Sequence, residues 1–330
     1  MTPNRVTRRA GRLAGEEEIV CHRANATASI SGVMTEPLAW DDVAARLAPV
    51  LGEPLRGGLP LTPGWSSRTT WAAHGERAGS LVVKARSGER VGEKTAWCAA
   101  RLPLLAARGY PVPTIIWHGM VRDDWHVTVQ NRLPGHPLTT LNGRLLEQVL
   151  GLVERQAGAA IPAGDRDFTG YIANVLFDDW DEVWADAARA GGAAGPLCAR
   201  IRRWLQPVWG LRLPAADFAH NDLNLSNILA DGDQITGVVD WDEFGLGSRA
   251  LDLVAAALDC QQRGAHAAAD RLLAAAASAA GGAGLRCLVS YRALAALAED
   301  TREGGQASQP ETQAIEAVLG KLDNPKAAGN

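Results

Sequence analysis

The sequence lacks the features of secreted, membrane-spanning and nucleic-acid-binding proteins. Its five cysteines are odd in number, widely separated and never spaced Cys-x-x-Cys, which argues against a disulfide framework and a zinc site. No uncharged apolar run approaches the roughly 18 residues that span a bilayer, and the N-terminus has no hydrophobic signal core. The formal net charge of -4 offers no basic field for nucleic acid. We therefore expect a cytoplasmic protein with buried thiols that binds neither membranes nor nucleic acid.

The sequence patterns change from strand-like to helical along the chain. Trp40 to Val50 has helical spacing, and Glu93, Trp97 and Leu104 share one face of a helix between two predicted hairpins. We predict an α+β fold in which a small antiparallel five-stranded sheet with one helix precedes a mainly helical region. The strands are expected near Leu55 and over 67–73, 80–85, 114–120 and 125–130, and the later helices over 143–157, 167–190, 197–207, 249–262, 265–280, 285–300 and 311–322.

The segment from His220 to Asp242 has the most informative spacing of polar residues. It begins His-Asn-Asp-Leu-Asn-Leu-Ser-Asn, continues through a hairpin with an Asp-Gly turn, and ends Val-Val-Asp-Trp-Asp. Because hairpin strands pair outward from the turn, Asn227 before the first strand and Asp240 after the second lie at the same open end. Asp222, five residues before Asn227, can reach that end as well.

An amide and two carboxylates at one point suit magnesium-dependent phosphoryl transfer. Mg²⁺ prefers oxygen ligands and, at such sites, takes only one or two of them from protein. The reaction also needs a carboxylate that orients the incoming hydroxyl and accepts its proton. Taken singly, each of these residues is equally explained as a turn or cap residue, but their combination indicates a kinase-type site.

This segment resembles the catalytic loop and metal-binding segment of the aminoglycoside phosphotransferase family, which includes antibiotic kinases and relatives of choline and homoserine kinases. That family has a His-x-Asp-x-x-x-x-Asn loop, a hairpin and an Asp-Trp-Asp/Glu segment. The resemblance implies Asp222 as catalytic base, Asn227 and Asp240 as magnesium ligands, and His220 and Asp252 as structural supports. It also implies a bilobal protein-kinase-like fold with ATP or GTP and Mg²⁺ as cofactors.

The resemblance divides the chain into three parts. We predict a disordered extension over residues 1–38, a nucleotide-binding N-lobe over 39–131, and a C-lobe over 132–330 that carries the catalytic loop and the acceptor site. The similarity covers about residues 50–260 and is densest at 218–245. The sequence leaves open whether the protein is a monomer or a homodimer.

The N-lobe offers a lysine for the nucleotide phosphates. Lys84 ends the apolar strand segment Leu81-Val82-Val83, and a strand lysine of this kind binds phosphates when a helix carboxylate positions it. Glu93 is the predicted partner, because its helix face also carries apolar residues. Glu89 is the alternative, and a further alternative is that Lys84 and Glu93 are unrelated surface charges.

Two further N-lobe segments are candidates for nucleotide contact. Ser66 and Ser67 end a Gly- and Pro-containing loop where the family places its nucleotide-positioning loop, although neither a Gly-x-Gly-x-x-Gly nor a Walker motif is present. Gln130 and Arg132 belong to a segment that resembles the family's interlobe hinge, whose backbone binds adenine. An ordinary surface loop and an ordinary domain junction explain these segments equally well.

The acceptor is expected to be a small molecule, and one acidic segment favours a cationic one. Residues 161–190 hold seven acidic side chains against two arginines, and Asp179 and Trp180 lie among them. A solvated helix face with buried tryptophans is the other explanation. Asp242 and Glu243 follow Asp240 directly and are the nearer candidates for acceptor contact.

Three functions compete. The leading one is an O-kinase for an antibiotic of aminoglycoside, basic peptide or nucleoside type, and hence a resistance enzyme. A housekeeping kinase for choline, homoserine or a sugar is the alternative, and a nucleotide-binding regulator without catalysis is the third. A protein kinase is disfavoured, because Asn221 and Asn224 replace the loop arginine and lysine and no Ala-Pro-Glu segment follows.

Overall fold

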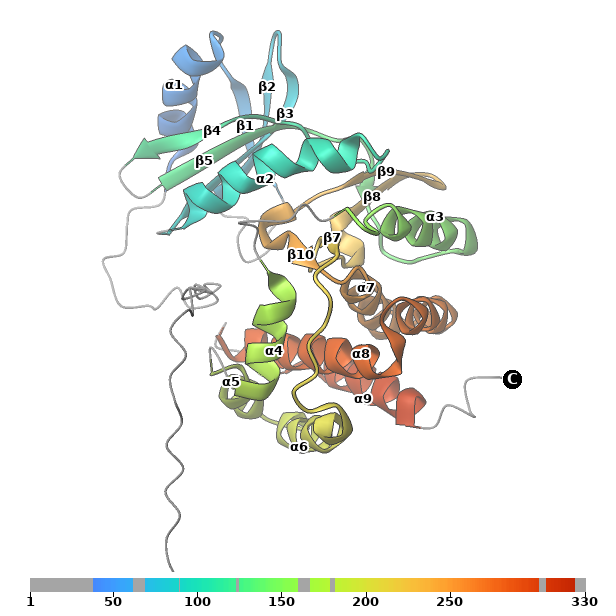
Figure 1. Cartoon of the computed structure of the whole chain (residues 1–330). Helices are drawn as coiled ribbons and strands as arrows, with labels where there is room; N and C mark the ends of the chain where they lie inside the picture. Colours follow the sequence, from blue (N-terminus) through green and yellow to red (C-terminus); the bar gives the residue numbers. More distant parts are fainter. Residues whose placement is uncertain are drawn as a thin grey trace, which may run out of the picture.

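The computed structural model has two lobes, with a sheet-based N-lobe packed on a larger helical C-lobe (Figure 1). This arrangement confirms the predicted bilobal α+β fold. Of the predicted N-terminal extension, only Leu38 belongs to the part that is described. The structure describes residues 38–61, 69–88, 90–122, 125–159, 167–178, 182–302 and 307–323.

Five antiparallel strands form the N-lobe sheet, as predicted, and their order in the sheet is β1-β2-β3-β5-β4. Side chains alternate between the two faces of a strand. In β3, Leu81, Val83 and Ala85 are fully buried on one face, so Lys84 and Arg86 point to the opposite face. The strands are β1 Arg56–Pro60, β2 Thr70–Gly75, β3 Gly79–Ser87, β4 Ile115–Arg122 and β5 Trp125–Asn131.

Two helices cover the two faces of this sheet. Helix α1, Trp40–Leu51, packs Val43 and Leu47 onto the face that carries the N-lobe core. Helix α2, Val91–Ala106, lies between the sheet and the C-lobe (Figure 1). The face of the sheet that carries Lys84 is therefore the one turned toward α2 and the C-lobe.

The buried face of α2 differs by one position from the predicted face. Cys98 and Leu102 are buried, whereas Leu104 is 38% exposed and Glu93 is exposed. Both sets repeat at helical spacing, so the pattern alone could not choose between them. As a result Lys94, and not Glu93, turns toward the C-lobe.

The C-lobe helices follow the predicted order with one division. In place of a single helix over 167–190, α4 ends at Asp178, and α5 begins after Glu182, whose left-handed φ of 53° is incompatible with a continuing helix. The helices are α3 Gly143–Glu154, α4 Phe168–Asp178, α5 Val183–Arg189, α6 Ala194–Leu205, α7 Ala250–Gln262, α8 His266–Arg302 and α9 Gln309–Asp323.

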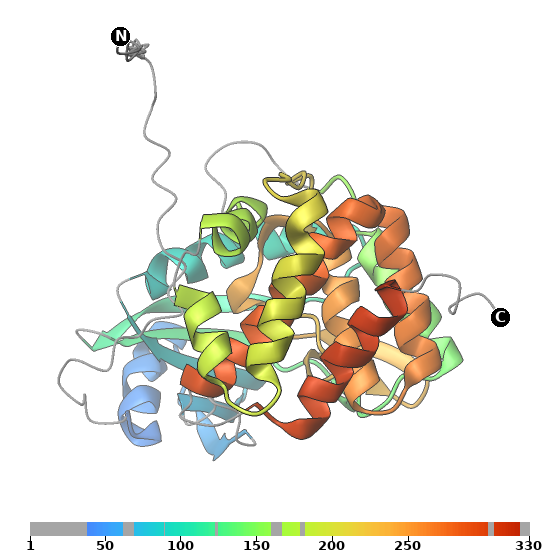
Figure 2. The same ribbon diagram turned by 90° about the horizontal axis from the view of Figure 1, so that it is seen from below.

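Helix α8 joins the two helices that were predicted over 265–280 and 285–300. Gly281, with a φ of 70°, marks the kink between them. By length and composition alone, the segment His266–Glu299 is apolar enough to cross a membrane. In the fold it packs against α7, α5 and α4, and Figure 2 shows it among the other C-lobe helices. We interpret α8 as the core helix of the C-lobe.

The described thiols belong to the larger hydrophobic cluster, which is centred on the C-lobe. Cys98, Cys198, Cys260 and Cys287 are buried thiols, as the sequence predicted, while Cys21 lies outside the described residues. Burial raises the pKa of Cys198 and Cys287 to about 11 and that of Cys260 to about 12. These thiols are therefore packing groups.

Short strands frame the loop that contains Asp222. The predicted hairpin is present as β8, Ile228–Asp231, and β9, Gln234–Val238, and β6, His136–Pro137, extends it. The pair β7, Asp217–Ala219, and β10, Gly245–Gly247, was not predicted. Three residues are too few to show alternation.

The link between the lobes packs directly on the hairpin. At Gly135, φ is 97°, and a Cβ atom would lie 2.5 Å from Thr236 Oγ1 and 2.7 Å from the Ala230 carbonyl oxygen. Thr236 Oγ1 also donates to the Pro134 carbonyl at 2.6 Å. Glycine is therefore required where the chain passes from the N-lobe to the hairpin.

Candidate active site

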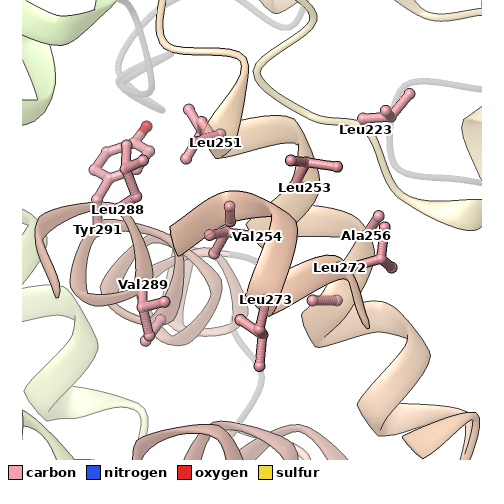
Figure 3. Packing of buried hydrophobic residues seen from close by; sticks show 14 of the residues in the cluster. Leu223, Leu251, Leu253, Val254, Ala256, Leu272, Leu273, Leu288, Val289 and Tyr291 are labelled. Atoms are coloured by element: carbon pink, nitrogen blue, oxygen red, sulfur yellow. The ribbon is translucent and has the colours of Figure 1, made fainter. Parts of the chain in front are cut away.

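The loop from His220 to Asn227 is anchored by alternate side chains. Leu223 and Leu225 are buried in the C-lobe core, and Figure 3 shows Leu223 beside the cluster that α7 and α8 form. Asp222 and Asn224 alternate with these anchors along the loop and are only half-buried. The Leu-x-Leu spacing thus fixes the loop while leaving its polar residues accessible.

Asp252, on α7, holds the start of this loop through its backbone. Its two carboxylate oxygens accept hydrogen bonds from the backbone N–H groups of His220 at 2.8 Å and Asn221 at 2.7 Å, and from Gln156 Nε2 at 2.8 Å. The carboxylate is fully buried, and burial raises its pKa in spite of these donors. Asn221 adopts a left-handed φ of 69°, which Asn tolerates better than most residues. The loop start is therefore set by a buried polar network.

His220 connects the loop to the hairpin. Its ring Nε2 lies 2.8 Å from the carbonyl oxygen of Val239, and its Nδ1 accepts a hydrogen bond from the Asp222 N–H at 3.3 Å. A neutral ring that donates through Nε2 and accepts through Nδ1 satisfies both contacts. Both nitrogens are engaged and the side chain is fully buried, so His220 links the loop to the hairpin, and its role as a structural support stays a prediction.

The Asp222 carboxylate is held from two sides and stays partly open to solvent. Oδ1 accepts from Arg292 Nη2 at 3.3 Å, and Oδ2 lies 3.4 Å from both Asn224 Nδ2 and Asn227 Nδ2. The side chain is 36% exposed. An oriented, accessible carboxylate of this kind is suited to accept a proton from a bound hydroxyl.

Asn227 and Asp240 lie at the same end of the hairpin, as the spacing predicted. Ile228 pairs with Val238, so the residues just outside this pair are neighbours. Asn227 donates through Nδ2 to the Asp222 carbonyl at 2.9 Å, which orients its amide. Asp240 has the left-handed angles φ 66° and ψ 61°, which turn the chain after β9.

The donor set at this end fits a magnesium ion. Asn227 offers Oδ1, because its Nδ2 is used by Asp222, and Asp240 offers an ionised carboxylate. Hard oxygen donors in this small number are what Mg²⁺ takes from protein when phosphates supply the rest. Within the described ranges no group of three His, Cys, Asp or Glu side chains forms a separate metal site. Metal binding by these two residues stays a prediction.

Lys84 meets Asp240 across the lobes. Its Nζ donates to Asp240 Oδ1 at 2.6 Å and lies 3.8 Å from Asp242 Oδ1. The Lys84 ammonium, acting against burial, lowers the pKa of Asp240. Burial by itself favours neutral Lys84, but the two carboxylates outweigh it and raise the pKa of Lys84. Both groups are therefore charged, and β3 is joined to the hairpin end.

The prediction that Glu93 is the partner of Lys84 is wrong. Glu93 pairs with Arg90 at 3.2 Å, and its side chain is 72% exposed. The reason is the one-position shift of the buried face of α2, which turns Glu93 toward solvent. The reserve candidate Glu89 lies outside the described residues.

Asp242 and Glu243, the predicted acceptor contacts, bind the N-lobe. Asp242 lies 3.6 Å from Arg86 Nε in addition to Lys84, and Glu243 pairs with Lys94 of α2 at 3.4 Å. Their carboxylates are 53% and 45% exposed, so both remain open to solvent. In this structure the two residues bridge the lobes, and acceptor contact by either stays a prediction.

Two of the other predicted contact residues, Gln130 and Arg132, lie at the end of β5. Gln130 is buried in β5, and the N–H of Arg132, which directly follows β5, donates to the Ser80 carbonyl of β3 at 2.9 Å. Nucleotide contact by either remains a prediction. Ser66, Ser67, Asp179 and Trp180 lie outside the described residues.

The acidic segment before α6 has structural roles where it is described. Asp167 accepts hydrogen bonds from Thr169 and Gly170 at the start of α4, and the buried Asp186 pairs with Arg302 at 2.6 Å. Trp184 is buried and donates to a backbone carbonyl. Trp184 is thus buried as the alternative of a helix face with buried tryptophans expects, whereas Asp186 is buried and not solvated.

Sequence reasoning missed two basic residues of the site, Lys94 and Arg292. Lys94 could have been found, because Lys94, Cys98 and Leu102 repeat every four residues as regularly as the chosen face. Arg292 lies 70 residues after Asp222 on α8, and no local pattern connects the two.

A bilobal fold in which a strand lysine, a loop carboxylate and a hairpin with an amide and a carboxylate meet defines the protein-kinase-like phosphotransferases. The model of the phosphotransferase enzyme family matches residues 58–289, and the chain belongs to this family. It is therefore an enzyme that transfers a phosphoryl group to the hydroxyl of a small molecule, as the sequence predicted.

Solved aminoglycoside phosphotransferases share the fold. One structure of APH(4)-Ia is 16% identical, has a TM-score of 0.63, and is matched over 88% of this chain and 100% of that chain. APH(3'')-Id from Streptomyces rimosus, in complex with ADP and streptomycin, is 17% identical with a TM-score of 0.53 over 77% of this chain and 98% of that chain. At these identities the likeness shows the fold. Among the curated proteins compared, none matches this chain.

Proposed function

We propose that this protein phosphorylates a hydroxyl group of an antibiotic, with MgATP or MgGTP as donor, and so acts as a resistance enzyme. The observation that carries the proposal is that four polar groups lie together. The Asp222 carboxylate is hydrogen-bonded to the Asn227 amide. Asn227 and Asp240 lie at the same end of the hairpin, and Asp240 accepts a hydrogen bond from Lys84. These are the groups that phosphoryl transfer needs.

Each group has a distinct task in this proposal. Asp222 orients the acceptor hydroxyl and takes its proton, and Lys84 binds the phosphates of the nucleotide. Asn227 and Asp240 hold Mg²⁺, which neutralises phosphate charge when bound. His220 and Asp252 fix the loop through the hydrogen bonds described above. Because all four reacting or binding groups are present, a regulator without catalysis is disfavoured.

Other proteins with the same fold support an antibiotic as the acceptor. The structures with this fold include complexes of other phosphotransferases with hygromycin B, kanamycin and streptomycin. The fold is thus used by phosphotransferases that bind aminoglycosides. The partly exposed Asp242 and Glu243 are the proposed acceptor contacts nearest to the chemistry.

One observation favours the alternative of a housekeeping kinase for choline, homoserine or a sugar. Each of the four acidic residues of the site has a basic partner. The pairs are Arg292 with Asp222, Lys84 with Asp240, Arg86 with Asp242, and Lys94 with Glu243. These pairs balance the charge near the reacting groups, so a polycation gains less there than an unpaired acidic field would give. A neutral or singly charged acceptor suits this balance.

An acceptor panel tests the proposal. We expect MgATP-dependent ADP formation with at least one aminoglycoside, basic peptide or nucleoside antibiotic, and about 10³-fold less with Asp222→Ala, because general-base catalysis contributes on this scale. Asp231→Ala, at the exposed hairpin turn, is the matched control and should keep the parent rate. Activity with choline, homoserine or a sugar only would select the alternative, and full activity of Asp222→Ala would refute the assigned base.

A further inference from the structure

Arg292 contacts the proposed catalytic base from outside the loop. It lies on α8, and its Nη2 donates to Asp222 Oδ1 at 3.3 Å. It follows residue 289, where the match to the family model ends, so that match gives it no role. A basic residue from a distant helix therefore reaches the group that is proposed to accept the proton.

The loop itself supplies no permanent positive charge at this point. From His220 to Asn227 it contains neither lysine nor arginine, and Asn224, two residues after Asp222, is neutral where protein kinases carry a lysine. The neutral amides of Asn224 and Asn227 approach one oxygen of Asp222, and the Arg292 guanidinium approaches the other. Arg292 thus occupies, from α8, the place of the absent loop cation.

The surroundings of Arg292 hold it in this position. Its side chain is only 21% exposed, and its neighbours Ser290 and Tyr291 are buried in the C-lobe core. Its Nε is buried and has no hydrogen-bond partner within the described part of the chain. Burying a guanidinium is unfavourable unless its charge is used, and the charge partner that the structure shows is Asp222. Packing alone does not explain an arginine here.

The distances place this charge close to the reaction. A hydroxyl that bonds to Asp222 Oδ1 would lie about 2.7 Å from it, so the hydroxyl oxygen would be within roughly 6 Å of Arg292 Nη2. In the transfer, the hydroxyl oxygen bonds to the γ-phosphorus, the bond from that phosphorus to the bridging oxygen breaks, ADP leaves with the electron pair, and the hydroxyl proton passes to Asp222. A fixed cation at this range stabilises the charge on the transferred group.

We propose that Arg292 is a positioning residue for phosphoryl transfer, which orients the Asp222 carboxylate and supplies beside it the positive charge that the loop lacks. The inference rests on the proposed function, because it takes Asp222 as the base. It predicts an effect on turnover and little effect on nucleotide binding, since Lys84 and the hairpin end lie on the other side of Asp222.

Substitutions that separate charge from packing test this role. Arg292→Gln removes the charge and keeps hydrogen-bonding capacity, and we expect kcat to fall on the order of 100-fold, as for loss of one preorganised donor. Arg292→Lys keeps the charge without the forked geometry and should stay within about 10-fold of the parent. The KM for MgATP should change by less than about 2-fold in both, because each substitution removes an interaction with Asp222 and none with the proposed nucleotide-binding groups.

Arg286→Gln is the matched control on the same helix. Arg286 is also partly buried, donates to the Trp204 carbonyl at 3.1 Å and lies over the Trp204 ring, but it does not contact the loop. Its loss should lower the melting temperature and leave kcat unchanged. Arg292→Met serves as a second neutral variant if Arg292→Gln fails to fold.

Chemical rescue gives an independent readout. Arg292 borders a pocket of about 240 Å³ that Asn224, Ser226 and residues of α7 and α9 also line, so a small solute can reach the space it leaves. Millimolar guanidinium ions should restore part of the kcat of Arg292→Ala and have no effect on Arg286→Ala.

The outcomes distinguish this inference from the proposed function. Parent-level kcat in Arg292→Gln, or equal losses in Arg292→Gln and Arg292→Lys, would overturn the inference, and loss of activity in Asp222→Ala would then leave the proposed function intact. Full activity in Asp222→Ala would overturn both. A loss in Arg292→Gln that Arg292→Lys and guanidinium each relieve supports the inference.

Discussion

The two halves of the active site are held together in different ways. In the C-lobe, buried hydrogen bonds from Asp252 fix the loop backbone, and a hairpin fixes Asn227 relative to Asp240. The N-lobe residues of the site contact the C-lobe through ion pairs, such as Lys84 with Asp240 and Lys94 with Glu243. The carboxylates of Asp240 and Glu243 are 39% and 45% exposed. The C-lobe half is preorganised, and the contact between the lobes is adjustable.

This difference assigns separate tasks to the two halves. Preorganised groups suit the chemical step, which requires a base in a fixed position. Partly exposed ion pairs contribute little stability and exchange partners readily, which suits residues that must release one another when nucleotide enters. Changes in the C-lobe half should therefore affect turnover and folding, and changes in the N-lobe half should affect nucleotide binding.

The largest effect is expected where the two halves meet, at Asp240. Asp240→Asn removes the charge and keeps a residue that tolerates the left-handed backbone. We expect the Kd for MgATP to rise on the order of 100-fold, because the proposed magnesium site would lose its one ionised protein ligand. Isothermal titration calorimetry measures this, with Asp242→Asn as control. A similar loss in both variants would show that charge in general, and not metal binding, is responsible.

The next largest effect, on MgATP binding, tests whether Glu93 is a partner of Lys84. Lys84→Met should weaken MgATP binding by about 10-fold or more, the value of a hydrogen bond to a charged group. Glu93→Gln should change it by less than about 2-fold, because Glu93 forms only an exposed ion pair with Arg90. Equal effects of the two variants on the Kd would mean that Glu93 turns inward when nucleotide is bound.

Asp252 tests the preorganisation of the C-lobe half. In Asp252→Asn, an amide nitrogen replaces one of two oxygens that both accept hydrogen bonds, so a buried N–H group faces a donor. We expect the free energy of unfolding in urea to fall by about 2 kcal/mol. Asp270→Asn, which breaks the exposed pair with Lys321, should change it by less than about 0.5 kcal/mol. Equal losses would remove the argument for a buried support.

The smallest effect concerns the bridge between α2 and the C-lobe. A double-mutant cycle with Lys94→Met and Glu243→Gln should give a coupling energy below about 1 kcal/mol that decreases further at high salt. Such a value keeps the contact between the lobes adjustable. A coupling of several kcal/mol, measured by urea unfolding, would instead make α2 a fixed part of the C-lobe.

The same comparison explains what the sequence could predict. The hairpin end was predictable, because spacing around a tight turn fixes which residues are neighbours: Asn227 and Asp240 follow from the Asp-Gly turn alone. The sheet and most helices were predictable from periodicity. The three-residue strands β7 and β10 were not, because they are formed by pairing across the loop and show no pattern of their own.

Contacts between distant elements were not predictable. The partner of Lys84 depends on which face of α2 is buried, and two faces one residue apart fit the pattern equally well. The contact of Arg292 with Asp222 depends on how α8 packs against the loop, which tertiary structure alone decides. Spacing identified the groups that are proposed to carry the chemistry, and packing determined which charged residues lie next to them.

The central claim is that Asp222, Asn227 and Asp240 gather around a magnesium-bound triphosphate. A crystal structure with Mg²⁺ and a non-hydrolysable ATP analogue tests it most directly. The account predicts that Asn227 Oδ1 and the Asp240 carboxylate bind the metal, that Lys84 moves from Asp240 to the phosphates, and that Asp222 faces the γ-phosphoryl group without binding the metal. Nucleotide bound elsewhere, or a metal that touches neither Asn227 nor Asp240, would contradict it.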